Sequence, residues 1–283
     1  MKKAIILDVD GVIIGEKKDV NTPHPHPAVI EKLKAVRMSG IPIVLCTAKP
    51  AFAIEYEIKE ACLDNPHIAD GGGLLVDNDG VVAKQYPLDS EIAGQVVAAL
   101  LAKNIYTEVY TADQYYIQES QKGNMTDRHN FVLQRSPVTV PNLVEFCRTA
   151  NITKIMQIVA NESKKSFGES VFAPFSEKTS LYWAVHPPIL PLQFGVITAQ
   201  NITKRQGARD IAEILDIPIK NFLAVGDSTA DWKFMELCGY TGAMGNASDE
   251  LKESVKTKSK NGYIGNHVDE NGVIEILDWY LGI

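Results

Sequence analysis

The 283-residue sequence predicts an α/β protein in which a parallel sheet, with helices on both faces, carries an inserted α+β module. Near both ends of the chain, short apolar runs alternate with amphipathic segments, as in an open parallel sheet. The middle of the chain instead combines strands of aromatic content with short helices. The length agrees with two domains, since a domain averages about 150 residues.

The N-terminal segment predicts two strands and the helix between them. Residues 4–7 are an apolar run that stops at acidic residues, as expected for a buried parallel strand. Residues 28–39 carry apolar side chains at helical spacing, and Gly40 stands where a helix C-cap is expected. The second strand, residues 43–46, ends at Thr47. We therefore expect a strand–helix–strand unit whose strands end in polar residues.

The C-terminal segment repeats this pattern. Lys204 opens a predicted helix with its apolar residues on one face, and residues 222–225 form a buried strand that ends at Gly226-Asp227. Open α/β sheets bind ligands at the carboxyl ends of their strands. We therefore expect Asp8, Thr47 and Asp227 to lie at one edge of the sheet.

The central segment is interpreted as the inserted module. Its expected elements are a helix at 90–103, strands at 106–111 and 115–119, a polar loop at 120–130, a helix near 142–150 and a strand at 154–159. Tyr182 and Trp183 fall in a further strand, where we expect them to pack in a core. Lys122, Arg128 and His129, in the polar loop, are candidates for reading the substrate.

The predicted boundaries divide the chain into a discontinuous core, residues 1–82 and 189–283, and a module at residues 83–188. The run Gly71-Gly72-Gly73 and the pair Pro187-Pro188 with Pro191 are candidate hinges near the two ends of the module.

Composition excludes several classes of partner. Lys and Arg total 28 against 35 for Asp and Glu, a net charge of −7, which does not favour nucleic acid or an anionic membrane. The sequence shows neither a signal-peptide core nor an apolar run long enough for a membrane span, so we expect a cytoplasmic protein. Its four cysteines lie far apart, which predicts no disulfide framework. The oligomeric state cannot be inferred from the sequence.

Asp8 and Asp10 are the most informative pair in the sequence. On an extended strand, residues two apart point to the same side, and two carboxylates there repel unless a cation holds them. Mg²⁺ suits such a site, because it prefers oxygen ligands and accepts a substrate phosphate. Asp227 and Asp231 follow another buried strand, and Lys204 adds a cation. Together these groups match the needs of phosphoryl transfer through an aspartyl-phosphate.

Four ordered motifs extend this interpretation to a family. Asp8-Val9-Asp10-Gly11-Val12, Thr47, Lys204 and the segment from Gly226 to Asp231 resemble the motifs of the haloacid dehalogenase (HAD) superfamily. A mixed module between the second and third motifs resembles the type II cap of subclass IIB, the Cof-type and sucrose-phosphate-phosphatase-like enzymes. The run Gly242-Ala243-Met244-Gly245-Asn246-Ala247 also resembles a segment of that subclass. The resemblance implies a Rossmann-like core with an inserted cap.

The resemblance also implies roles for individual residues. Asp8 is the nucleophile, and Asp10 is the general acid and base. Thr47 and Lys204 act on the phosphoryl group, and Lys204 also offsets the charge of Asp8. The implied substrate-binding residues are Thr47, Ala48, Lys49, Lys204 and Asn246. The implied Mg²⁺ site consists of Asp8, the carbonyl of Asp10, Asp227 and Asp231.

The sequence departs from the family pattern in three places. Thr47-Ala48-Lys49-Pro50 replaces Thr-Gly-Arg-Pro, which exchanges a bidentate guanidinium for a point charge. Asp70-Gly71-Gly72 replaces Asn-Gly-Ala near the expected hinge, and Ala230 precedes Asp231 where Asn is common.

The predicted function is a Mg²⁺-dependent phosphatase acting on a small phosphorylated metabolite, with a sugar phosphate favoured. One alternative is a phosphotransferase like the phosphomannomutases, which use the same aspartyl-phosphate. Another is a non-catalytic phosphate-binding or signalling module, although a receiver domain would lack an acid/base residue at the position of Asp10 and would not need a cap.

Overall fold

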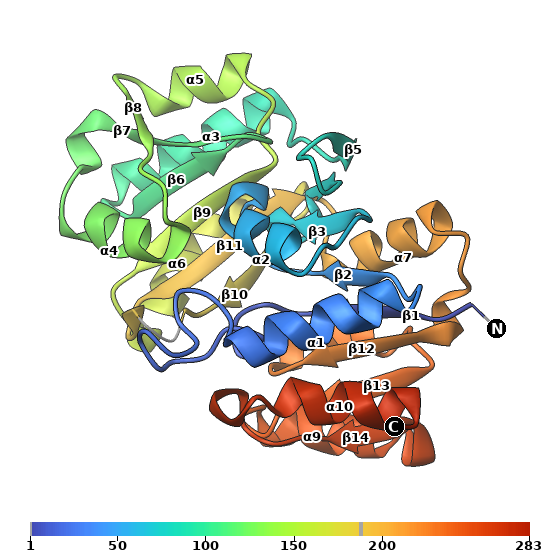
Figure 1. Cartoon of the computed structure of the whole chain (residues 1–283). Helices are drawn as coiled ribbons and strands as arrows, with labels where there is room; N and C mark the ends of the chain where they lie inside the picture. The colour runs from blue at the N-terminus through green and yellow to red at the C-terminus, as the bar shows by residue number, and fades with distance from the viewer. Residues whose placement is uncertain (1, 187–188) are drawn as a thin grey trace.

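The computed structural model describes residues 2–186 and 189–283, which form a core and a cap (Figure 1). The core sheet is parallel and has the strand order β14-β13-β12-β1-β2. Its strands are β1 (Ala4–Leu7), β2 (Ile43–Leu45), β12 (Phe222–Gly226), β13 (Tyr240–Ala243) and β14 (Gly262–Ile264). A parallel bridge from Cys46 to Ile68 continues this sheet toward a small antiparallel sheet of β3 (His67–Ala69), β4 (Leu74–Val76) and β5 (Val82–Gln85).

Helices cover both faces of the core sheet. One face packs against α1 (Pro27–Met38), α2 (Glu55–Glu60) and α10 (Gly272–Leu281). The other packs against α7 (Lys204–Ile214), α8 (Thr229–Met235) and α9 (Asp249–Lys256). Strand β1 is apolar throughout because both of its faces are buried: Ile5 and Leu7 face the first group of helices, and Ala4 and Ile6 face the second. The predicted fold class is confirmed.

The cap is built around a six-stranded sheet with the order β10-β11-β9-β6-β7-β8. Its strands are β6 (Tyr106–Tyr110), β7 (Tyr115–Gln118), β8 (Val138–Val140), β9 (Lys154–Val159), β10 (Thr179–Ala184) and β11 (Gln193–Ala199). Helices α3 (Ser90–Ala102), α5 (Leu143–Thr149) and α6 (Lys165–Phe172) pack on one face, and α4 (Asn124–Leu133) packs on the other. Strand β10 stands at the end of this order, so within residues 2–186 and 189–283 it is an edge strand that pairs on one side only, with β11.

The domain boundaries differ from the predicted ones at both ends of the cap. The predicted boundaries placed residues 189–283 in the core, but residues 193–199 of this segment form β11, which pairs with β10 and β9 in the cap sheet. At the other end, a boundary after residue 82 cuts β5, which pairs with β4 of the small sheet. The apolar pattern of a strand does not indicate which of two sheets it joins. Its hydrogen-bonded neighbours in the folded protein decide this. Of the expected hinges, Gly71–Gly73 lies at the turn after β3, whereas Pro187 and Pro188 lie outside the described residues.

The polar loop expected at residues 120–130 is largely the helix α4. Its buried face includes Thr126 and His129, whose polarity hides the helical periodicity in the sequence. The hydroxyl of Tyr106 donates to Thr126 Oγ1 at 2.9 Å, so burial of this polar residue is compensated. Among the described residues, no helix combines the length and apolarity needed to cross a membrane.

Candidate active site

Asp8 lies directly after β1, at the carboxyl edge of the core sheet. Its side chain is largely buried, and its Oδ1 accepts a hydrogen bond from the main-chain N–H of Val9 at 2.7 Å. Its Oδ2 accepts one from Lys204 Nζ, also at 2.7 Å. Strands β12 and β2 flank β1, so the segments that follow all three strands converge here. Asp8, Thr47 and Asp227 therefore lie at one edge of the sheet, as expected from the sequence.

Lys204 joins two of the predicted carboxylates. It is the first residue of α7, and its Nζ also donates to Asp231 Oδ1 at 2.8 Å. Asp231, in the first turn of α8, uses its other oxygen to accept from the N–H and hydroxyl of Ser228 at 3.1 and 2.8 Å. These contacts anchor the start of α8 and aim Asp231 at the lysine. The two helices thus place one cation between two carboxylates.

Asp8, Asp227 and Asp231 form a compact acidic cluster. One oxygen from each lies within 4.8 Å of the others. Gly11 makes room for the cluster: it has φ +78°, and a Cβ atom there would lie 2.0 Å from Asp227 Oδ2. The glycine of the first motif is therefore required both by its conformation and by the close approach of Asp227.

The raised pKa values of Asp8 and Asp227 indicate that the cluster carries more negative than positive charge. Burial, with a further contribution from Asp231, raises the pKa of Asp8 to about 8, although Lys204 lowers it. Burial and the two neighbouring carboxylates also raise the pKa of Asp227 well above its ordinary value. Burial would likewise raise the pKa of Asp231, but Lys204 outweighs it and the pKa is lowered. Three carboxylates against one ammonium leave room for a divalent cation, which fits this oxygen-only donor set.

Asp10 is held apart from this cluster by two other groups. Lys49 Nζ lies 2.9 Å from Asp10 Oδ1, and His186 Nδ1 lies 3.4 Å from Asp10 Oδ2. Burial would raise the pKa of Asp10, but the charge of Lys49 and the contact with His186 outweigh it, so the pKa is lowered. Lys49, predicted to bind substrate, is itself buried and does not line the cavity described below.

Thr47 and Ala48 form the loop after β2. The Thr47 side chain is 1% exposed and lines the cavity beside Asp8. Its Oγ1 accepts the N–H of Lys49 at 3.0 Å, which leaves the hydroxyl proton free to be donated to a ligand. Ala48 also lines the cavity.

Asn246 supports the first motif from behind. Its Nδ2 donates to the carbonyl of Gly11 at 2.8 Å, and its Oδ1 accepts from the N–H of Val268 at 3.0 Å. Asn246 is not among the residues that line the cavity. The structure therefore places this predicted substrate-binding residue against the backbone of the Asp10-Gly11 turn.

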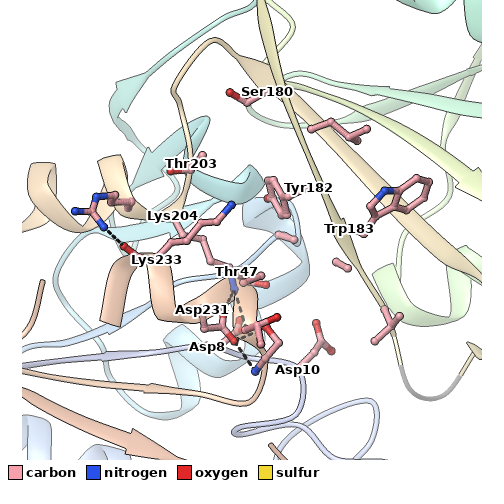
Figure 2. A pocket seen from close by; sticks show the side chains of 18 of the residues that line it. Asp8, Asp10, Thr47, Ser180, Tyr182, Trp183, Thr203, Lys204, Asp231 and Lys233 are labelled. Atoms are coloured by element: carbon pink, nitrogen blue, oxygen red, sulfur yellow. Dashed lines mark hydrogen bonds and ion pairs between the residues drawn. The ribbon is translucent and has the colours of Figure 1, made fainter. Parts of the chain in front are cut away.

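A cavity of about 510 Å³ joins these core residues to the cap (Figure 2). The edge strand β10 forms one wall with Tyr182 and Trp183, while Lys204 and Asp231 stand on the core side. The expectation that Tyr182 and Trp183 are core residues is therefore wrong in part: both also face the cavity. They remain half-buried because β10 is an edge strand, a placement that its apolar pattern does not reveal.

The three cap residues predicted to contact the substrate, Lys122, Arg128 and His129, lie away from the cavity. Arg128 donates to the carbonyls of Ile189 and Leu190, and His129 is buried 2.9 Å from Glu108. Neither residue lines the cavity, and nor does Lys122. Sequence reasoning missed His186 instead, a lone histidine for which no local signal exists, because its partner Asp10 is 176 residues away.

Fold and site together define an enzyme of the haloacid dehalogenase class. The family model for haloacid dehalogenase-like hydrolases matches residues 5–277, and the chain belongs to this family. The prediction of a Cof-type, subclass IIB member and of a phosphoric monoester hydrolase is confirmed by the comparisons that follow.

Three relatives illustrate the similarity. The chain is 25% identical to the 5-amino-6-(5-phospho-D-ribitylamino)uracil phosphatase YwtE of Bacillus subtilis (strain 168), over 99% of this chain and 98% of the other. It is 22% identical to the phosphoglycolate phosphatase of Methanosarcina acetivorans, over 98% of each chain. The solved structure of the HAD subclass IIB sugar phosphatase BT4131 matches with a TM-score of 0.80 at 19% identity, over 100% of both chains.

Proposed function

We propose that this protein is a Mg²⁺-dependent phosphatase that hydrolyses a small phosphorylated metabolite through an aspartyl-phosphate on Asp8. The observation that carries the proposal is the placement of Asp8, which faces the cavity, contacts Lys204 Nζ at 2.7 Å and belongs to the acidic cluster with Asp227 and Asp231. A carboxylate can attack an anionic phosphate only where cationic groups offset their repulsion.

In the proposed reaction, a carboxylate oxygen of Asp8 attacks phosphorus and the leaving oxygen takes a proton from Asp10. A water molecule then attacks the phosphorus of the aspartyl-phosphate and gives a proton to Asp10, which releases phosphate and restores Asp8. Bound phosphate adds negative charge near Asp10, which favours its protonated form against the effect of Lys49 and His186. The Thr47 hydroxyl and Lys204 hold the transferred group.

Mg²⁺ fits the donor set of the acidic cluster. Asp8, Asp227 and Asp231 would hold it, together with the carbonyl of Asp10 that the family resemblance implies. When bound, the ion supplies positive charge that allows the phosphate to approach Asp8.

The substrate class follows from the cavity and the relatives. By their names, the relatives act on a phosphoribitylamino-uracil, on phosphoglycolate and on a sugar phosphate, all small phosphate esters. A cavity of about 510 Å³ with polar and aromatic walls accommodates a ligand of this size. We propose a sugar phosphate as the substrate of this chain.

The test is phosphate release from a panel of sugar phosphates and other phosphometabolites, with Mg²⁺ and with EDTA. We expect Mg²⁺-dependent release from one or a few compounds, and a loss of at least about 1,000-fold in kcat for Asp8→Asn. Asp64→Asn, at an exposed carboxylate paired with Arg37, is the matched control and retains activity.

Two results would contradict the proposal. If no phosphate is released but a phosphate donor labels Asp8, the protein is a phosphotransferase. If neither release nor labelling occurs, the protein is a binding or signalling module.

A further inference from the structure

A buried ion pair joins the cap to the core beside the active site. Lys154, the first residue of β9 in the cap, lies with its Nζ 2.9 Å from Oδ1 of Asp70, in the turn after β3 of the core. Both side chains are 0% exposed. The hydroxyl of Thr153 donates to Asp70 Oδ2 at 2.7 Å, and Lys154 Nζ also lies 3.7 Å from the centre of the Tyr110 ring. A cation so deeply buried requires several partners, and Lys154 has them.

Lys154 also contacts the loop that carries Thr47. Its Nζ donates to the carbonyl of Ala48 at 2.8 Å. The main-chain N–H groups of Gly71 and Asp70 donate to the carbonyls of Thr47 and Lys49, each at 2.9 Å. The three consecutive carbonyls of residues 47–49 are therefore all held, the outer two by the core turn and the middle one by the cap.

This arrangement fixes the peptide plane between Ala48 and Lys49 at both ends. Its carbonyl accepts from Lys154, and its N–H donates to Thr47 Oγ1 at 3.0 Å. The orientation of the Thr47 hydroxyl thus depends on the peptide that Lys154 holds. The same peptide leads into Lys49, whose Nζ lies 2.9 Å from Asp10 Oδ1.

Close packing between cap and core keeps the contact in place. A Cβ atom on Gly73, three residues after Asp70, would lie 2.5 Å from the carbonyl oxygen of Thr153. On Gly71 it would lie 1.5 Å from the hydroxyl oxygen of Tyr182 in β10. The cap thus approaches the core turn so closely that only glycine fits at these two positions.

We propose that Lys154 is a positioning residue, through which the docked cap sets the geometry of the loop at residues 47–49. The inference rests on the proposed phosphatase function. The loop supplies the Thr47 hydroxyl to the phosphate and the Lys49 cation to Asp10, so both phosphate binding and proton transfer depend on a side chain of the cap that touches neither substrate nor the reacting atoms.

The test compares three variants with the wild type. Lys154→Met removes the ammonium and leaves the negative charge of Asp70 buried without a countercharge, whereas D70N/K154M removes both charges and relieves that penalty. Lys258→Met is the matched control, because Lys258 Nζ also donates to main-chain carbonyls, those of Glu236 and Cys238, and does not line the cavity. Thermal unfolding shows whether each variant is folded.

The readouts are kcat/KM for acetyl phosphate and for the best sugar phosphate, and the affinity for orthovanadate by calorimetry. For Lys154→Met and for D70N/K154M we expect kcat/KM to fall on the order of 100-fold, by the same factor with both substrates, because the misplaced loop acts on the phosphate that they share. Orthovanadate affinity falls as well, and Lys258→Met behaves as the wild type.

Two results would overturn the inference. Wild-type kcat/KM in D70N/K154M would show that only the unpaired Asp70 charge matters. A loss confined to the sugar phosphate would make Lys154 a specificity contact. If the wild type itself releases no phosphate, the proposed function fails, and orthovanadate affinity still decides the inference: unchanged affinity in D70N/K154M rejects it and weakened affinity supports it.

Discussion

In the core, Asp8 and Asp227 follow the ends of buried strands and Lys204 begins a helix, whereas the cap contributes an edge strand, a histidine after it and the first residue of an inner strand. Asp8, Thr47 and Asp227 converge because their strands are neighbours in one parallel sheet. His186 and Lys154 reach the site only because the cap docks on the core. The core thus carries the groups that we propose to react, and the cap adds contacts to Asp10 and to the carbonyl of Ala48.

We expect the largest loss of activity from a substitution in the core, at Lys204. Lys204→Met removes the cation that contacts Asp8 at 2.7 Å and Asp231 at 2.8 Å. We expect kcat/KM to fall about 1,000-fold with every substrate, because the lost charge acts on the phosphoryl group itself. Steady-state kinetics with acetyl phosphate and the best sugar phosphate measure this. A loss restricted to one of the two substrates would mean that Lys204 contacts the organic part of that substrate. The assignment of phosphoryl contacts to the core would then be wrong.

The contact between His186 and Asp10 tests whether the cap reaches the proton-transfer step. His186→Phe keeps a ring against His129 and Phe194 but removes the nitrogen 3.4 Å from Asp10. We expect kcat to fall about tenfold to 100-fold with little change in KM, because the position of Asp10 changes and the phosphate contacts do not.

His186→Gln is the matched variant for this prediction. Its amide can still donate to Asp10, so it should recover part of the lost kcat. Equal kcat for His186→Phe and the wild type would confine the role of the cap to substrate binding.

A substitution in the cavity wall formed by β10 should give the smallest loss of kcat/KM, and the loss should depend on the substrate. Trp183 lines the cavity, and its indole N–H donates to Glu169 at 2.9 Å, which holds the ring in place. We expect Trp183→Ala to lower kcat/KM about tenfold for the best sugar phosphate and to leave acetyl phosphate unchanged, because only the larger substrate extends to this wall. The ratio of the two kcat/KM values is the measurement. An equal loss with both substrates would assign Trp183 to the stability of the cap.

Much of the core site could be predicted because its determinants are local. A strand buried on both faces must be apolar, so Asp8 and Asp227 stand out where β1 and β12 end. Asp231 follows from the same segment, since it caps the helix that begins there. Lys204 was recognised from its place in the order of the motifs and lies where that order implied.

The cap could be predicted only in outline. Its strand β9 has the expected bounds, but α4 was taken for a loop because its buried face contains Thr126 and His129. Lys49 was expected to meet the substrate and instead pairs with Asp10. Nothing in the sequence near Lys154 indicates Asp70 or Ala48 as its partners.

By itself, the sequence determined the fold class, the order of the four motifs and the residues that we propose to react. These depend on hydrophobic patterning and on residue types at strand ends, which act over a few residues. The tertiary structure decided the sheet that β11 joins, the exposure of Tyr182 and Trp183 to the cavity, and the contacts of His186 and Lys154 with the core. These depend on how two sheets pack across many residues of chain, and no local pattern encodes that geometry.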